Sequence, residues 1–268
     1  MSAYHIIADA HGNVQHPDIR RIRFSQIGKA LRLGFDDFWQ KPSHYVFLCL
    51  IYPIAGVVLV AWSSGANLLP LVYPLVTGFA LVGPVAAIGL YEISRRRELG
   101  LDTSWRHALE VRKSPALPSI IALGAMLVGL FIAWLVTAYL LYAYLFGDAA
   151  PASVGAFLDG VFNTPEGLQL AVAGTSIGFV FALTVLATTV ISFPLLLDRD
   201  VGAISAVETS VRVALANPFP VLAWGLIVAF LLFIGTLPVF AGLAIVLPWL
   251  GHSTWHLYRM TVVSDQAD

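Results

Sequence analysis

Charged residues are scarce in this sequence of 268 residues. Asp, Glu, Lys and Arg together make up 12% of it, whereas hydrophobic residues make up 58%. Soluble domains carry roughly 25% charged residues. A soluble chain of this length has too small an interior to bury so much apolar surface. The composition therefore predicts an all-α integral membrane protein, because helices satisfy their own backbone hydrogen bonds within a bilayer.

Cysteine is almost absent as well. Cys49 is the only one, which excludes an intrachain disulfide and a cysteine-rich metal site. The sequence also has no glycine-rich phosphate loop with its lysine and no nucleic-acid-binding pattern. Ion-coupled transporters usually keep ionisable side chains within the membrane, and the long apolar segments here contain no Asp, Glu, Lys or Arg. We therefore expect a protein that is not an enzyme and that binds no nucleic acid.

Six apolar segments are long enough to cross a bilayer, which takes about 20 residues of helix. The fourth contains Pro194, where we expect a tilt or a bend. The last two are continuous in sequence, and Gly235 and Pro238 predict a turn between them, because Gly suits a helix end and Pro a helix start. The segments cover residues 44–62, 68–91, 117–146, 167–197, 218–235 and 238–258.

All 15 Lys and Arg residues fall on one side of this six-span arrangement. The loops on the other side, 63–67 and 147–166, contain none. Positive charge in short loops marks the cytoplasmic side, so we expect both termini in the cytoplasm. A five-span alternative would place Arg259 on the opposite side of the membrane from the other basic residues. We expect a polar N-terminal tail (1–23), one transmembrane domain (24–260) and a polar C-terminal tail (261–268).

A threefold internal repeat precedes the spans. Segments 24–42, 101–115 and 201–218 each space their apolar residues like a helix and end in a polar residue followed by proline. The pattern predicts three hairpins of two spans, each preceded by a cytoplasmic amphipathic helix at the membrane surface. The alternative is that any connection beside anionic lipid becomes amphipathic. The shared apolar faces comprise Phe24, Ile27, Leu31, Phe35 and Phe38 in the first segment, and Ile204, Val207, Val211 and Leu215 in the third.

His252 and His256 are the main candidates for a metal or haem site, because residues four apart share one helix face. The same spacing occurs in zinc proteases, but these need a Glu after the first His, and Ser253 stands there. The alternative is an interfacial belt of Trp255, His256, Tyr258 and Arg259 that closes the last span.

Two other groups of residues point to the cytoplasmic face. Trp105 and His107 in the second amphipathic segment echo Trp255 and His256, and with Arg259 they suggest a pocket there, although two unrelated interfacial pairs would leave the same pattern. Arg95, Arg96 and Arg97 follow the second span directly. They suggest binding of anionic lipid headgroups, or a role in membrane orientation alone.

Two stretches resemble an uncharacterised, mostly alphaproteobacterial family of predicted six-helix membrane proteins, a domain of unknown function. They are LLDRDVGAISAVETSVRVALANP (196–218) and LPWLGHSTWHLYRM (247–260), and the resemblance runs from about Phe24 to Met260. The family implies a multi-pass protein of the bacterial inner membrane and no settled activity.

Three functions fit these observations. The first is a non-enzymatic accessory protein, meaning a subunit, assembly factor or scaffold of a membrane complex such as a respiratory one. It would have the lipid bilayer and a membrane protein complex as partners, and no cofactor. The second is a carrier or exporter of a lipid or small apolar solute, suggested by the spans rich in Pro and Gly and by the repeat. The third is a haem or metal binder that uses His252 and His256.

Overall fold

The structure, a computed structural model, describes residues 17–40, 54, 56–58, 61, 69–79, 83–147 and 151–263. It divides the chain into two compact units. Unit 1 comprises Met1–Pro53, Gly83–Ala125 and Leu186–Asp268, and unit 2 comprises Ile54–Val82 and Met126–Val185. Most of the predicted first span (44–62) and of the N-terminal tail lies outside the described residues. The predicted single domain over 24–260 stays a prediction.

The described part of the chain is all-helical, as predicted, apart from one isolated β-bridge. α8 (Leu117–Phe146) and α10 (Pro165–Thr189) begin or end in one unit and continue in the other. Unit 2 also contains α5 (Leu69–Phe79) and α9 (Val154–Asn163). Unit 1 contains α2 (Phe24–Gln40), α6 (Gly83–Ala86), α7 (Ile88–Glu98), η2 (Trp105–Lys113), α11 (Ser192–Asp198), α12 (Ala203–Ala216), α13 (Pro218–Thr236) and α14 (Leu243–Thr261).

Three stretches of the described residues are long and apolar enough to cross a membrane. They are α8, the segment from Pro165 to Asp198 that contains α10 and α11, and α13. A shorter apolar helix covers Leu69–Gly78. The coarse prediction of a helical membrane protein is thus supported, whereas these helices correspond to three of the six predicted spans.

The predicted second span, 68–91, is not one continuous helix. α5 ends at Phe79, and α6 and α7 are separated at Ala87. Pro74 and Pro84 each lack the backbone N–H that a helix interior needs, and the glycines of this stretch weaken the helix further. α7 continues well past residue 91 into the polar sequence that carries Arg95, Arg96 and Arg97.

The predicted bend in the fourth span is confirmed. α10 ends at Thr189 and α11 begins at Ser192, so the break lies just before Pro194. A proline ring clashes with the carbonyl four residues earlier, here that of Val190. Within unit 1, the Ser192 hydroxyl donates to the Ala206 carbonyl oxygen at 3.0 Å, so α12 holds the bend in place.

The last two predicted spans form a hairpin, α13 and α14, within unit 1. The turn between them brings the two glycines Gly235 and Gly242 so close that a Cβ on Gly242 would lie 2.8 Å from the Gly235 Cα. α14 begins at Leu243, five residues later than predicted, and ends at Thr261. The predicted turn position is therefore close to the observed one.

Unit 1 also joins the two ends of the described chain. Ile19 and Val262 form an isolated antiparallel β-bridge. The Arg20 amide donates to the Thr261 carbonyl oxygen at 2.8 Å, and the Val263 amide donates to the Asp18 carbonyl oxygen at 3.0 Å. At the start of α13, Asn217 Oδ1 accepts from the Ile22 amide at 2.7 Å. The start of α13 and the end of α14 are thus bound to the same N-terminal segment.

Of the three predicted amphipathic helices, α12 matches best. Its buried face consists of small and polar residues, including Ser205, Thr209 and Ser210. The predicted apolar face is partly uncovered: Ile204 is 54% and Leu215 76% exposed, whereas Val207 and Val211 are half-buried.

α2 divides its apolar residues between two directions. Ile27 and Phe38 are buried against other helices of unit 1, whereas Phe24 and Phe35 of the same predicted face are exposed. The helix therefore does not turn one uniform apolar face toward the membrane. The physical reason is that the small residues Ala30 and Gly34, both buried, allow α14 to approach beside Ile27.

The second predicted amphipathic helix, 101–115, is wrong in type and length. Residues 101–104 have no regular secondary structure, and η2 (Trp105–Lys113) is a 3₁₀ helix. Asp102 Oδ1 accepts the Ser104 amide at 3.1 Å, which holds a turn before the helix begins. The ion pairs between η2 and α7, described below, determine how this segment packs, and the spacing of its apolar residues does not.

Candidate functional site

A polar cluster within unit 1 joins α2, α7 and α14 around Asp37. Arg97 Nη1 lies 2.7 Å from Asp37 Oδ1, and His256 Nε2 lies 3.0 Å from Asp37 Oδ2. Ser94 Oγ donates to the same Oδ2 at 3.2 Å. Three side chains from two other helices therefore meet the one carboxylate of α2, which is itself buried.

The contacts of Asp37 explain its acidity. Burial alone would raise the pKa of the carboxyl group, but the hydrogen bond with His256 and the pairing with Arg97 lower the pKa to about 2. Asp37 is therefore ionised at neutral pH and only accepts hydrogen bonds. It follows that the hydrogen between His256 and Asp37 belongs to Nε2.

His252 lies behind Ser94 in this cluster. Its Nδ1 is 2.7 Å from Ser94 Oγ, and its side chain is completely buried. Since the single hydroxyl hydrogen of Ser94 is donated to Asp37, the hydrogen between Ser94 and His252 is assigned to Nδ1. The two histidines of α14 thus share a face, as predicted. His256 contacts Asp37 directly, whereas His252 is connected to it through Ser94.

Two further carboxylates bind side chains near the end of α14. Glu98 of α7 accepts from Trp255 Nε1 at 3.0 Å and from Arg259 Nε at 2.9 Å. Asp198 of α11 accepts from the Tyr258 hydroxyl at 2.6 Å and from Arg259 Nη1 at 3.3 Å. Arg259 therefore bridges α7 and α11, and Trp255 and Tyr258 are almost fully buried.

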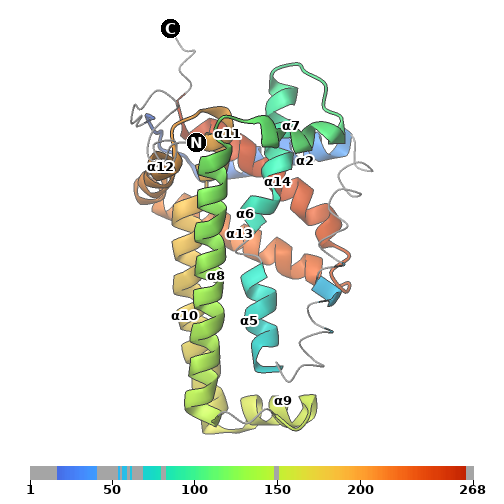
Figure 1. The fold of residues 1–268 in the computed structure, drawn as a ribbon, viewed down its shortest axis with the longest axis vertical. Coiled ribbons are helices and arrows are strands. Elements are labelled where there is room, and N and C mark those ends of the chain that lie inside the picture. The colour runs from blue at the N-terminus through green and yellow to red at the C-terminus, as the bar shows by residue number, and fades with distance from the viewer. Residues whose placement is uncertain are drawn as a thin grey trace. The chain divides into compact units, whose positions relative to one another are not determined.

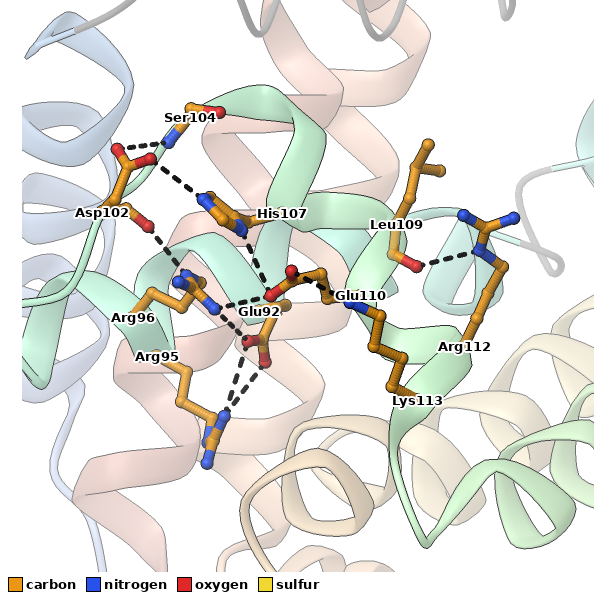
Figure 2. A network of polar contacts seen from close by, with 10 residues as sticks. All are labelled: Glu92, Arg95, Arg96, Asp102, Ser104, His107, Leu109, Glu110, Arg112 and Lys113. Atoms are coloured by element: carbon orange, nitrogen blue, oxygen red, sulfur yellow. Dashed lines mark hydrogen bonds and ion pairs between the residues drawn. The ribbon is translucent and has the colours of Figure 1, made fainter.

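A third network joins α7 to η2 (Figure 2). Arg96 Nη1 lies 2.8 Å from Glu110 Oε2, and its Nε donates to the Asp102 carbonyl oxygen at 2.7 Å. His107 lies between the carboxylates of Asp102 and Glu110, at 2.9 and 3.1 Å. The hydrogen bond from His107 lowers the pKa of Glu110. Glu92, which is buried, pairs with Arg95 at 3.2 Å.

These contacts show where the structure puts the predicted pocket residues. Trp255 and Arg259 meet at Glu98, and His256 binds Asp37, whereas His107 belongs to the network around Glu110. The indole nitrogen of Trp255 and the hydroxyl of Tyr258 bind carboxylates inside unit 1. Trp255 and Tyr258 are thus buried within unit 1, and the interfacial belt of Trp255, His256, Tyr258 and Arg259 stays a prediction.

The three predicted headgroup-binding arginines each pair with a carboxylate of unit 1. Arg95 pairs with Glu92, Arg96 with Glu110, and Arg97 with Asp37. Lipid binding by these residues stays a prediction, and a headgroup would have to compete with those ion pairs.

No group of three or more His, Cys, Asp and Glu side chains within the described ranges is arranged to hold a metal ion. His252 and His256 direct their contacting nitrogens toward Ser94 and Asp37. The metal or haem hypothesis for this pair stays a prediction.

Residues 174–178 spell Gly-Thr-Ser-Ile-Gly, the spacing of a serine hydrolase nucleophile. That motif works on a strained turn between a strand and a helix. Here it lies inside α10, and Ser176 Oγ donates to the Val172 carbonyl oxygen of its own helix at 2.7 Å. The segment is an ordinary apolar helix with a hydroxyl bonded to its backbone.

The residues that sequence reasoning missed are the carboxylates. The spacing of Glu92 with Arg95 and Arg96, three and four residues on, is a local signal that was available. Asp37, Glu98 and Asp198 find partners more than 50 residues away in the chain. Local spacing carries no information about such pairs.

Comparison with known proteins agrees with this picture. Residues 72–198 match the family described as predicted integral membrane protein (DUF2189). This stretch of the chain is similar to that domain of unknown function. The resemblance stated above is confirmed for the family, although the match ends at residue 198 and so leaves out the GHSTWHLYR segment. No curated protein matches the chain. No solved structure matches it either.

Proposed function

We propose that this protein is a non-enzymatic accessory protein of a membrane complex: a subunit, assembly factor or scaffold. In this proposal the ion-paired helices of unit 1 serve as a rigid base, and the apolar helices contact lipid and a partner. The polar side chains of the candidate site support this, because their described contacts link one helix to another.

One face of α8 carries the proposal. Only 22% of its most apolar window is buried by the chain itself. Ala125, Gly129 and Ala133 are exposed there at a spacing of four, and a Cβ on Gly129 would meet nothing within 4 Å. Small residues at this spacing let two transmembrane helices approach closely. We assign this face to a helix of the partner.

The pairing of the chain ends supports an even number of membrane crossings. Residues 18–20 and 261–263 are hydrogen-bonded, so both lie on one side of the membrane. α13 begins and α14 ends at this same N-terminal segment. In this proposal α14 therefore crosses the membrane back to the side on which α13 begins. With 44–62 and a crossing that contains α5, the proposed total remains six, with both termini in the cytoplasm of an inner membrane.

The exposed apolar residues of α2 and α12 fit helices that lie at the cytoplasmic surface. On α12, Ile204 and Leu215 are exposed beside the exposed Glu208. On α2, Phe24 and Phe35 are exposed beside the charged residues Arg32 and Asp36. Such neighbouring apolar and charged strips suit the boundary between headgroups and acyl chains.

Purification of the tagged protein from native membranes, followed by mass spectrometry of the proteins and lipids that accompany it, tests the accessory role. We expect one membrane protein to co-purify in a fixed ratio. Gly129→Leu should release that partner, because the added side chain blocks close helix approach. Val128→Phe adds bulk to an exposed site about 100° around α8 from Gly129, outside this face, and should retain it. If no protein co-purifies in a fixed ratio, the proposal is wrong.

A further inference from the structure

The connection between α8 and α10 contains a short helix that the sequence patterns did not reveal. α9 covers Val154–Asn163, in the stretch treated above as a loop. Ser153 accepts the Ala156 amide at 3.1 Å and so caps its start. Pro165 begins α10 after a single residue, Thr164.

The two faces of α9 differ in chemistry. Val154, Leu158 and Phe162 follow one another at a spacing of four and are all exposed, Phe162 by 78%. Asp159 and Asn163 lie about 100° and 140° around the helix from the centre of this stripe, joined by a hydrogen bond of 2.7 Å. None of the ten residues is buried. In water, this apolar stripe would remain solvated at a cost in free energy.

Contacts within unit 2 prevent α9 from turning its stripe inward. Phe157 contacts Tyr142 of α8, with ring centroids 6.3 Å apart. At the other end, Thr164 Oγ1 donates to the Gly160 carbonyl oxygen and accepts the Gly167 amide at 3.0 Å. Gly167 also lies so close to the carbonyl of Val161 that a Cβ there would overlap it. Figure 1 shows α9 extending to the side from the lower ends of α8 and α10, below α5.

The position of α9 in the chain identifies what covers the stripe. α8 and α10, between which it lies, are both long and apolar enough to cross a membrane. Near this end of α8, Tyr139 and Tyr144 are exposed, Tyr144 by 85%. Exposed tyrosines at the end of a spanning helix mark the depth of the headgroups. The stripe of α9 is thus tethered at that depth.

We propose that α9 lies in the plane of the membrane on the face opposite the basic segments, with Val154, Leu158 and Phe162 at the boundary between headgroups and acyl chains. Residues 147–166 contain no Lys or Arg, so anionic lipid is not required for this contact. The attachment depends on apolar area and on the tether to α8 and α10. It is therefore expected in uncharged phosphatidylcholine and at high salt.

Site-specific fluorescence tests the proposal. In a Cys49→Ala background, single cysteines replace Phe162 or Val154 on the stripe, and the exposed Asn163 on the far side of the helix as the matched control. Each full-length variant is labelled with a small environment-sensitive dye and reconstituted into phosphatidylcholine vesicles. We expect a nitroxide placed high on the acyl chain to quench the stripe probes several-fold more than the Asn163 probe. Iodide in the water should quench them in the reverse order.

The other outcomes have distinct meanings. If both faces are quenched equally by iodide, α9 lies in water and the proposal is wrong. If the stripe probes are shielded from iodide and from the lipid nitroxide, a second copy or another protein covers them, and the proposal is also wrong. Agreement between the Phe162 and Val154 positions guards against a variant that has lost its fold.

Discussion

Gly34 of α2 lies directly against Ser253 of α14. A Cβ built on Gly34 would overlap the backbone of Ser253, at 2.6 Å from its Cα. The contact lies between two hydrogen bonds: Trp249 Nε1 donates to the Leu31 carbonyl oxygen, and Asp37 accepts from His256. Helices α2 and α14 thus run alongside each other over this length, and the absence of a side chain at residue 34 lets them do so.

Gly34→Ala should therefore destabilise unit 1, since overlap with backbone cannot be relieved by rotating a side chain. Overpacking of this kind costs about 1–3 kcal/mol, and Gly34→Val should cost more. Thermal unfolding in detergent, followed by size-exclusion chromatography, measures the effect. Gly28→Ala on the same helix is the control, because a Cβ there meets nothing within 4 Å. Equal stability of the Gly34 and Gly28 variants would contradict the close contact.

Asp37 predicts a dependence of stability on pH. Its pKa is about 2 in the folded protein, against an ordinary 3.8. A carboxyl group with a lowered pKa contributes its full stabilisation above the unfolded value. That contribution disappears as the pH falls through the folded value. The difference between the two pKa values corresponds to about 2 kcal/mol of the free energy of unfolding.

Asp37→Asn should lower the unfolding temperature at neutral pH, since Arg97 and His256 lose their carboxylate. The difference in unfolding temperature between this variant and the unmodified protein should narrow as the pH falls from about 4 to 2, over the range in which Asp37 protonates. Asp36→Asn removes an exposed carboxylate from the same helix and should show no such difference. A difference that stays constant from pH 4 to pH 2 would argue against the pairing of Asp37.

Apolar spacing predicted the helices but not their partners. α8, α13 and the α10–α11 bend follow from length, hydropathy and Pro194, which are local properties of the chain. The same reasoning gave α2 a uniform face, yet Ile27 and Phe38 pack inward while Phe35 does not. The direction of a side chain depends on which helix arrives beside it, and sequence spacing is silent on that point.

The candidate site shows the same division. His252, Trp255 and His256 stood out because their residue types are rare and their spacing is helical. Local spacing does not distinguish Asp37 and Glu98 from other acids, although His256 binds to the first and Trp255 to the second. A carboxylate becomes recognisable as a hub only when the fold brings its distant partners within 3 Å or so. A chain-wide count of charges could not identify which acids are buried.

The bridge between Ile19 and Val262 predicts a cross-link. Paired residues in an antiparallel bridge have Cα atoms about 4.5–5.5 Å apart, a separation that a disulfide spans without strain. Ile19→Cys with Val262→Cys, in a Cys49→Ala background, should form an intramolecular disulfide on mild oxidation. Peptide mass spectrometry detects it. The pair Gly28→Cys with Val262→Cys should not cross-link, and failure of the first pair would contradict the joined chain ends.

The position of Trp134 predicts that two glycines of α10, Gly178 and Gly174, differ in how well they tolerate substitution. Its indole nitrogen donates to the Pro74 carbonyl oxygen at 3.1 Å, and its ring lies against Gly178. A Cβ on Gly178 would lie 3.0 Å from that ring, whereas a Cβ on Gly174 would make an ordinary contact with Leu141 at 3.7 Å. Gly178→Val should thus destabilise the protein by about 1–3 kcal/mol, and Gly174→Ala should be nearly neutral. Tryptophan emission should change with the first variant alone, as its ring is displaced. Should both variants unfold at the same temperature, the packing of α10 on Trp134 would be wrong.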